Sequence, residues 1–268
     1  MERRDDEPAP GFDTGFVKVC ISWPWARAFE GADKNVVGQD HSVALKNKAA
    51  EISSQLKGTS IFLVGINNNI KAKLGNVLAD MLRYYYFDSD SLVEQAAGGE
   101  AAAKSFREKD DKGFLESETE VLRQLSSMGR LVICTGDGAV KSSTNLSFMR
   151  HGISIWIDVP IVVLAKEVKE SGNQPPPDDV ILNSDPSKAV AKLTELFERM
   201  RGGYATADAT ISLQKVASQL GYDDTDAVTI EDMAMEVKKQ PQLLTTAFRE
   251  IEKLTRVKKM MEAAARPF

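Results

Sequence analysis

The chain has 268 residues and a formal net charge of −5 at pH 7. This length suffices for one α/β domain with extensions and a full hydrophobic core. The acidic balance argues against nucleic acid as a partner, because nucleic-acid-binding domains usually carry a basic surface. No apolar run reaches the ~18 residues that a membrane-spanning helix needs. Two cysteines, Cys20 and Cys134, are too few for a disulfide framework and suit a reducing compartment or buried thiols.

Residues 1–41 are expected to form a tail and an arm outside the main domain. The first residues are acidic, whereas transit peptides are acid-poor, so we expect no transit peptide within this chain. From Val17 to Trp25 apolar side chains occupy alternate positions, which predicts a half-buried strand. This arm either covers its own domain or, through Trp23 and Trp25, docks a protein partner.

Helices and strands alternate through the middle of the chain. Apolar spacing predicts helices over 42–56, 72–83, 161–170 and 187–200, further helices beyond 228, and helices over 91–128 broken near 98–99 and 110–113. Apolar runs predict strands at 60–64, 84–87, 131–134, 153–159 and 209–213. The alternation predicts a parallel sheet with helices on both faces, whose ligand lies at the carboxyl ends of the strands.

Polar motifs follow three of these predicted strands: Gly65–Ala72, Asp88–Asp90 and Gly136–Gly138. The first has the frame of a phosphate-binding loop, G-x-x-x-x-G-K-[ST]. Gly65 and Lys71 fit the pattern, but Ile70 replaces the second glycine and Ala72 replaces the hydroxyl that binds magnesium. We therefore expect a nucleotide-kinase framework with damaged nucleotide chemistry.

The loop residues differ in what they can still do. Asn68 and Asn69 tolerate left-handed backbone, whereas β-branched Ile70 would be an outlier there. Lys71 still offers a cation to phosphate, although without its ligand it is expected to be a solvated cation. Ala72 offers no oxygen to magnesium, so binding of ATP and Mg²⁺ is expected to be weak or absent.

The order of the motifs resembles the shikimate kinase family, the plant plastid form in particular. The resembling segments are 65–71, Phe87–Asp90, Thr135–Val140, Gly152–Pro160 and Val228–Ala234. The resemblance covers about 42–237 and implies a P-loop fold like that of nucleoside monophosphate kinases, which moves phosphate from ATP to shikimate. It also implies vestigial roles: Gly65, Asn68, Asn69 and Lys71 for nucleotide, Asp88 for magnesium and catalysis with Lys71, and Asp90, Gly136, Gly138 and Arg201 for shikimate.

The departures from the family pattern lie within this site. Leu115 stands where the family has the arginine that grips the substrate carboxylate, and Asp137 adds a negative charge there. Glu167 aligns with an arginine near the lid, and residues 173–179 of the lid contain no arginine. Losing two arginine clamps would weaken binding by roughly 3–6 kcal/mol. Shikimate phosphorylation is therefore not expected.

Several surviving residues also have structural interpretations. Asp88 and Asp90 could cap the following helix, as aspartate often does. Arg201 could form a salt bridge with Asp137 inside the vacated site. The isolated His41 and His151 suggest no metal.

Residues 238–268 are predicted to form a helix that begins at Pro241. Its apolar positions are Leu243, Ala247, Ile251, Leu254, Val257 and Met261, and much of the rest is basic. This helix either packs on the domain or contacts a partner or an anionic membrane.

The resemblance to the catalytically silent branch of the family implies a pseudoenzyme of the chloroplast stroma. That branch implies a binding or regulatory role in chloroplast biogenesis, without a resident cofactor. One alternative is a kinase that acts on another small molecule. The other is a scaffold without a ligand, acting through the Trp23/Trp25 arm or the C-terminal helix.

Overall fold

The computed structural model describes residues 39–66, 69–171, 186–215 and 241–264. The predicted arm at Val17–Trp25 and the lid at 173–179 lie outside these residues. The described elements are α2 (Gln39–Leu56), β1 (Ile61–Val64), α3 (Asn69–Leu82), β2 (Tyr85–Asp88), α4 (Ser89–Ala97), α5 (Glu100–Lys109), α6 (Asp111–Ser126), β3 (Leu131–Cys134), the 3₁₀ helix η2 (Asp137–Lys141), α7 (Ser143–Met149), β4 (Ile153–Asp158), α8 (Ile161–Ser171), α9 (Pro186–Tyr204), β5 (Ala209–Ser212) and α12 (Pro241–Ala264).

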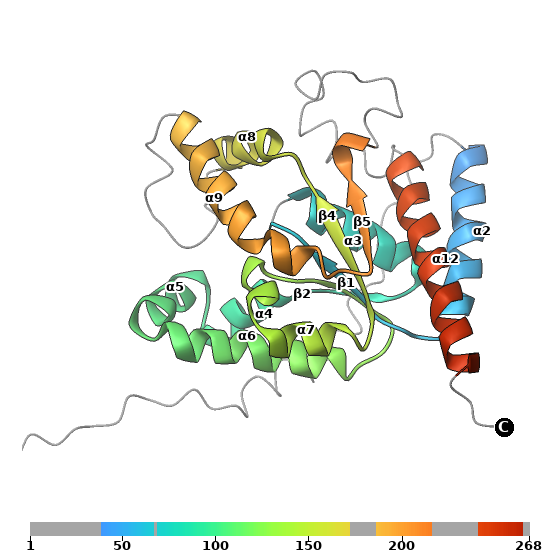
Figure 1. Cartoon of the computed structure of the whole chain (residues 1–268), viewed down its shortest axis with the longest axis horizontal. Helices are drawn as coiled ribbons and strands as arrows, with labels where there is room; N and C mark the ends of the chain where they lie inside the picture. The colour runs from blue at the N-terminus through green and yellow to red at the C-terminus, as the bar shows by residue number, and fades with distance from the viewer. Residues whose placement is uncertain (1–38, 67–68, 172–185, 216–240, 265–268) are drawn as a thin grey trace, which may run out of the picture.

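The strands of the described residues form a five-stranded parallel sheet in the order β2-β3-β1-β4-β5. All four side chains of β1 and of β3 are buried. Continuous apolar runs of this kind are typical of parallel strands covered on both faces. Figure 1 shows α2 and α12 side by side on one side of the sheet and α6 and α7 on the other. The predicted α/β class and the parallel sheet are thus confirmed.

The topology places the three polar motifs at one edge of the sheet. In the register Leu63 pairs with Cys134, and Asp88 also pairs with Cys134, so β1, β2 and β3 end level with one another. The chain leaves β1 for β2 on one side and later enters β4 on the other side. This change of direction is where open α/β sheets hold their ligands.

Local signals explain where several helices begin and end. The Asp88 carboxylate accepts a hydrogen bond from the Ser91 backbone N–H at 3.0 Å, and α4 ends at Gly98 with a φ of 95°. The Asp110 carboxylate caps α6 in the same way through Gly113, at 2.9 Å. These caps satisfy backbone groups that a helix end leaves unpaired. The predicted breaks near 98–99 and 110–113 are therefore confirmed.

The start of α3 differs from the prediction. The helix was expected to begin at residue 72, but it begins at Asn69. Ile70 and Lys71 therefore have helical backbone, and both are fully buried. Ile70 belongs to the hydrophobic core, so its burial favours an early start to the helix.

Helix α12 packs against α2 and also contacts β5. The side chains of Ala247, Phe248 and Ile251 are buried, and Leu254 is partly buried against the core. Val257 was expected on this apolar side but is 46% exposed, because Thr255 is the buried residue on this turn of the helix. The interpretation that this helix packs on its own domain is therefore supported for its central turns.

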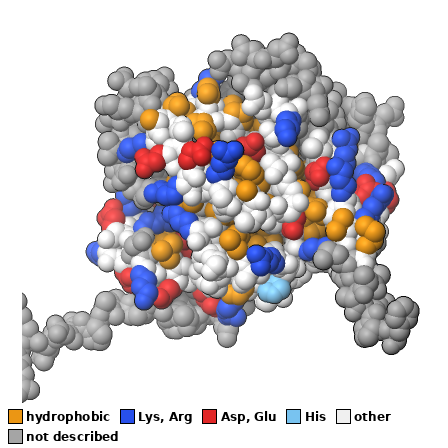
Figure 2. Space-filling view, viewed as in Figure 1, with side chains coloured by type: hydrophobic (Ala, Val, Ile, Leu, Met, Phe, Trp, Pro, Cys, Tyr) orange, Lys and Arg blue, Asp and Glu red, His pale blue; other side chains and the backbone are white. Residues whose placement is uncertain are grey.

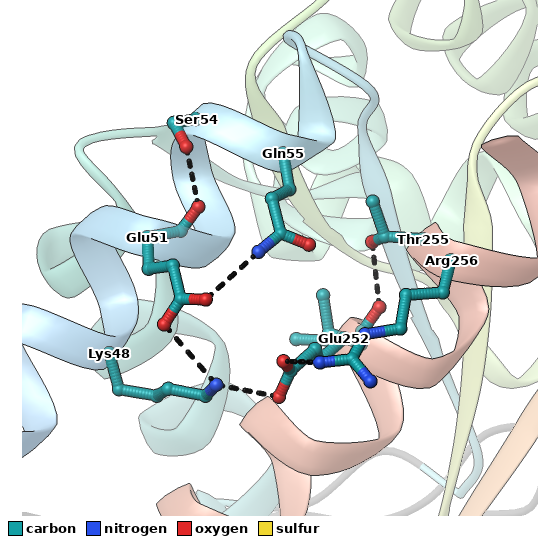
Figure 3. Close-up of polar contacts among 8 residues, drawn as sticks. Lys48, Glu51, Ser54, Gln55, Glu252, Thr255 and Arg256 are labelled. Carbon is teal, nitrogen blue, oxygen red and sulfur yellow. Dashed lines mark hydrogen bonds and ion pairs between the residues drawn. The ribbon is translucent and has the colours of Figure 1, made fainter.

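Polar contacts surround the apolar contact between α2 and α12 (Figure 3). Glu252 forms ion pairs with Lys48 of α2 at 2.7 Å and with Arg256 at 2.6 Å. The Lys258 ammonium donates a hydrogen bond to the carbonyl oxygen of Gly152. Partly exposed ion pairs contribute little to stability, so burial of Phe248 and its neighbours is the larger contribution.

The surface of the described residues carries charges of both signs. In Figure 2 acidic and basic side chains are interspersed over the visible face. Within the described ranges, no helix combines the length and the apolar character that crossing a membrane requires. The predicted division at residues 41 and 237 remains a prediction.

Phe248 provides a test of the packed position of α12. Its side chain is 1% exposed, so Phe248→Ala should lower the free energy of unfolding by about 3–5 kcal/mol through lost burial and a cavity. Met260 lies on the same helix and is 64% exposed, so Met260→Ala is the matched control. Chemical denaturation of the full chain measures both values, and equal midpoints for the two variants would contradict this packing.

Candidate functional site

The loop between β1 and α3 requires glycine at its first position. Gly65 has a φ of +134°, a region that L-residues rarely adopt. A β-carbon at this position would lie 2.6 Å from the carbonyl oxygen of Ile157. The first glycine of the phosphate-loop pattern is therefore needed for the packing of the sheet edge, whether or not phosphate binds.

Lys71 is buried, contrary to the expectation of a solvated cation. Its side chain is 0% exposed, and its ammonium group donates to the carbonyl oxygens of Gly65 at 2.7 Å and Thr135 at 2.8 Å. The lysine thus connects the ends of β1 and β3. A buried ammonium group requires such acceptors because its desolvation is costly.

Glu167 of α8 contacts the start of α3. Its carboxylate accepts a hydrogen bond of 2.6 Å from the backbone N–H of Asn69, and its side chain is largely buried. The amides at a helix N-terminus are an anion-binding site, and here a carboxylate of the same chain lies against one of them. The side chain of Asn69 is itself exposed, and Asn68 lies outside the described residues.

The acceptor side of the site is built where β2 and β3 end. The backbone N–H of Gly136 donates to the Ser89 hydroxyl at 2.9 Å, which ties the start of α4 to the loop before η2. A β-carbon at Gly136 would collide with the Asp90 carboxylate. Asp88 serves as the N-cap of α4, so the capping interpretation is confirmed for this residue. Asp90 lies two residues later, in the first turn of α4, with its carboxylate against Gly136.

Asp90 belongs to a cluster of carboxylates. Burial, followed by the negative charges of Asp137, Asp88 and Glu118, raises the pKa of the Asp90 carboxyl to about 8, and Lys71 acts in the opposite direction. Asp137 is 7% exposed and Glu118 is 8% exposed. Like charges placed close together disfavour ionisation, and the raised pKa of Asp90 is the consequence.

Glu118 has a cationic partner that the sequence did not indicate. The guanidinium of Arg107 lies 3.2 Å from a Glu118 carboxylate oxygen and 4.1 Å above the centre of the Phe114 ring. The Glu118 carboxylate also limits the space at Gly138, because a β-carbon there would lie 3.2 Å from it. Leu115 is 39% exposed and offers no charge.

Arg201 does not form the expected salt bridge with Asp137. Its side chain is 62% exposed and lies 3.6 Å from Glu198, one turn earlier on α9. Tyr204, at the end of the same helix, is instead fully buried and stacks on Trp156 with a centroid distance of 5.9 Å. Arg201 is therefore an exposed residue paired with Glu198 and not with Asp137.

The structure brings most of the predicted site residues together. Gly65 and Lys71 meet at the end of β1, and Asp90, Gly136 and Gly138 meet beside them. In the described part of the chain, no three His, Cys, Asp or Glu side chains are placed to hold a metal ion. From the sequence, Glu167 was recognised only as standing where the family has an arginine, and its contact with Asn69 was not predicted. The role of Arg107 was missed because no sequence motif marks this residue.

Comparisons with known proteins agree with this geometry. The family model described as shikimate kinase matches residues 68–220. A protein of Arabidopsis thaliana named "Probable inactive shikimate kinase like 1, chloroplastic" is 54% identical over 235 residues, which cover 87% of this chain and 77% of that protein. "Shikimate kinase 2, chloroplastic" of Oryza sativa subsp. japonica is 40% identical over 78% of this chain and 69% of its own length.

A solved structure shows the same fold. The shikimate kinase from Acinetobacter baumannii in complex with shikimate is 25% identical and superposes with a TM-score of 0.52, covering 65% of this chain and 99% of that one. The family model matches more than half of this chain, and the plant relatives match it over most of their length. The chain belongs to the shikimate kinase family.

Proposed function

We propose that this protein does not transfer phosphate to shikimate and acts by binding, as a pseudoenzyme built on the kinase fold. The observation that carries the proposal is the contact between the Glu167 carboxylate and the Asn69 amide at the start of α3. A nucleotide phosphate at this amide would meet the negative charge of Glu167 at hydrogen-bonding distance. Like charges this close repel strongly in a largely buried site.

The other groups of the nucleotide loop support the same proposal. The Lys71 ammonium has the carbonyl oxygens of Gly65 and Thr135 as acceptors inside the protein. Two of its three donors are therefore already used in buried charge-assisted hydrogen bonds, which are among the stronger ones. Ala72 still lacks an oxygen for magnesium. We infer that no nucleotide or metal is resident here.

The names of the plant relatives support a plastid location. The relatives from Arabidopsis thaliana and Oryza sativa subsp. japonica described above are named chloroplastic proteins. We place this protein in the chloroplast stroma and assign it a role in chloroplast biogenesis, which rests on family resemblance. A loss-of-function line should therefore show impaired chloroplasts with normal shikimate 3-phosphate, and normal chloroplasts in that line would refute the assignment.

The two alternatives predicted from sequence find less support. A kinase for another substrate relied on Lys71, Asp88 and Asp90. The first of these is bonded to two carbonyls and the second caps α4. A ligand-free scaffold acting through the C-terminal helix is weakened because the Ala247–Ile251 turn is buried against the domain.

The first test is nucleotide binding and turnover by the unchanged full chain. Isothermal calorimetry with Mg-ATP should give no binding heat at millimolar nucleotide, because the amide, the lysine and the magnesium position are all compromised. A coupled assay with ATP and shikimate should stay at background, with an active shikimate kinase as the positive control. Saturable turnover of shikimate would overturn the proposal, and Mg-ATP binding without turnover would favour the kinase alternative.

The second test removes the Glu167 carboxylate. Glu167→Ala should bind inorganic tripolyphosphate at least about tenfold more tightly than the unchanged chain, because the Asn69 amide is freed and a repelling charge is lost. Glu195 is an exposed glutamate on α9, so Glu195→Ala is the control for a general change in net charge. Equal affinities for the two variants would show that Glu167 does not obstruct this anion site.

A further inference from the structure

A cavity of about 220 Å³ lies against the face of the sheet that α7 and α9 cover. On β4 the side chains of Ser154 and Trp156 share one face, because alternate residues of a strand do so. Trp156 stacks on Tyr204 of α9, and Ser154 lines the cavity. The 3₁₀ helix η2 contacts both α7 and α9, and a β-carbon at Gly203 of α9 would lie only 2.7 Å from Val140 of η2 (Figure 1). The lining includes neither the nucleotide-loop residues nor the carboxylate cluster, so this cavity is separate from the candidate site.

Much of the cavity wall is apolar. Val64, Val140 and Met149 line it and are at most 5% exposed. Leu146 and Ala207 also line it and are partly buried against the core. Binding pockets are mostly apolar with a few polar groups, and those that hold drug-sized ligands have volumes of about 300–1,000 Å³. A cavity of about 220 Å³ therefore fits a smaller molecule that has an apolar part.

Two charged residues of opposite sign belong to the same lining. They are Arg150, directly after α7, and Asp208, directly before β5. Arg150 is exposed, and its guanidinium makes no hydrogen bond or ion pair with the described residues, Asp208 included. A guanidinium presents a planar set of donors that matches a carboxylate, so Arg150 offers a position for a ligand carboxylate.

Asp208 is held in place by Ser154 of the neighbouring strand. Its Oδ2 accepts hydrogen bonds from the Ser154 backbone N–H at 2.7 Å and from the Ser154 hydroxyl at 2.8 Å. The backbone N–H of Asp208 donates to the same hydroxyl at 3.0 Å. These bonds connect the starts of β4 and β5 and fix the carboxylate. Its Oδ1 makes no hydrogen bond with the described residues, so it remains available to a donor.

We propose that this cavity binds a small α-amino acid with an apolar side chain. The ligand carboxylate pairs with the Arg150 guanidinium, and the ligand ammonium group donates to Oδ1 of Asp208. The ligand side chain lies against the apolar wall formed by residues such as Val140 and Met149. An apolar lining that also carries one unpaired charge of each sign matches a zwitterion better than it matches a simple anion or cation. This inference goes beyond the proposed function and does not depend on it, because no residue of the nucleotide loop takes part.

Calorimetry of the full chain with L-leucine and L-valine, at neutral pH and without nucleotide, tests the ligand class. We expect saturable binding at millimolar concentration. The analogue 4-methylpentanoate lacks the ammonium group, and 3-methylbutylamine lacks the carboxylate. Each should bind about three- to fivefold more weakly than L-leucine, because it loses one exposed ion pair. Absence of saturable heat with both amino acids, or equal affinity for either analogue and L-leucine, would overturn the proposal.

Two variants test the assigned atoms against the same ligands. Arg150→Gln should weaken the binding of L-leucine and of 4-methylpentanoate about three- to fivefold and leave 3-methylbutylamine unchanged. Asp208→Asn should weaken L-leucine by a similar factor and leave 4-methylpentanoate unchanged, a ligand-dependent pattern that a purely structural role does not produce. Arg199 is an exposed arginine of α9 outside the lining, so Arg199→Gln is the matched control. Circular dichroism verifies folding, and equal affinity for L-leucine in folded Arg150→Gln and Arg199→Gln chains would refute the site.

Discussion

The buried ammonium group of Lys71 is the interaction on which the rest of the site depends. It bonds the carbonyl oxygens that follow β1 and β3, two neighbouring strands whose ends carry the polar motifs. Removing it would leave those carbonyls in a dry interior, where unpaired polar groups are costly. A lysine inherited from a phosphate-binding loop is here a structural residue, and this explains why it is retained while the groups around it have changed.

The acceptor side shows a complementary change. Its backbone still has the form that a substrate crevice requires, since Gly136 leaves room for the Asp90 carboxylate and Ser89 binds the Gly136 amide. The side chains beside this backbone are acidic, with Asp137 and Glu118 buried, whereas Leu115 carries no charge. The fold preserves the geometry of the crevice because the core requires it, whereas the charges inside it are free to diverge.

The sheet was predictable because buried parallel strands such as β1 and β3 are continuous apolar runs, and the helix breaks were predictable from glycine and aspartate caps. The start of α3 was missed because the burial of Ile70 depends on packing that no local pattern contains. The exposure of Arg201 was missed because its pairing with Glu198 depends on side-chain packing along α9 that the R-x-x-Y pattern does not contain. The contact of Glu167 with Asn69 joins residues 98 positions apart, beyond any spacing rule.

The Glu167 contact and the proposed absence of nucleotide binding have a consequence for the amount of folded protein. A protein that binds a nucleotide is stabilised by mass action, so its folded fraction and its lifetime rise with the nucleotide concentration. Here the amide at the start of α3 is bonded to Glu167 of the same chain. On the function proposed above, no nucleotide adds to the stability of the fold. The abundance of this protein should therefore stay constant when light and darkness change the adenylate pool, unlike that of a relative stabilised by ATP.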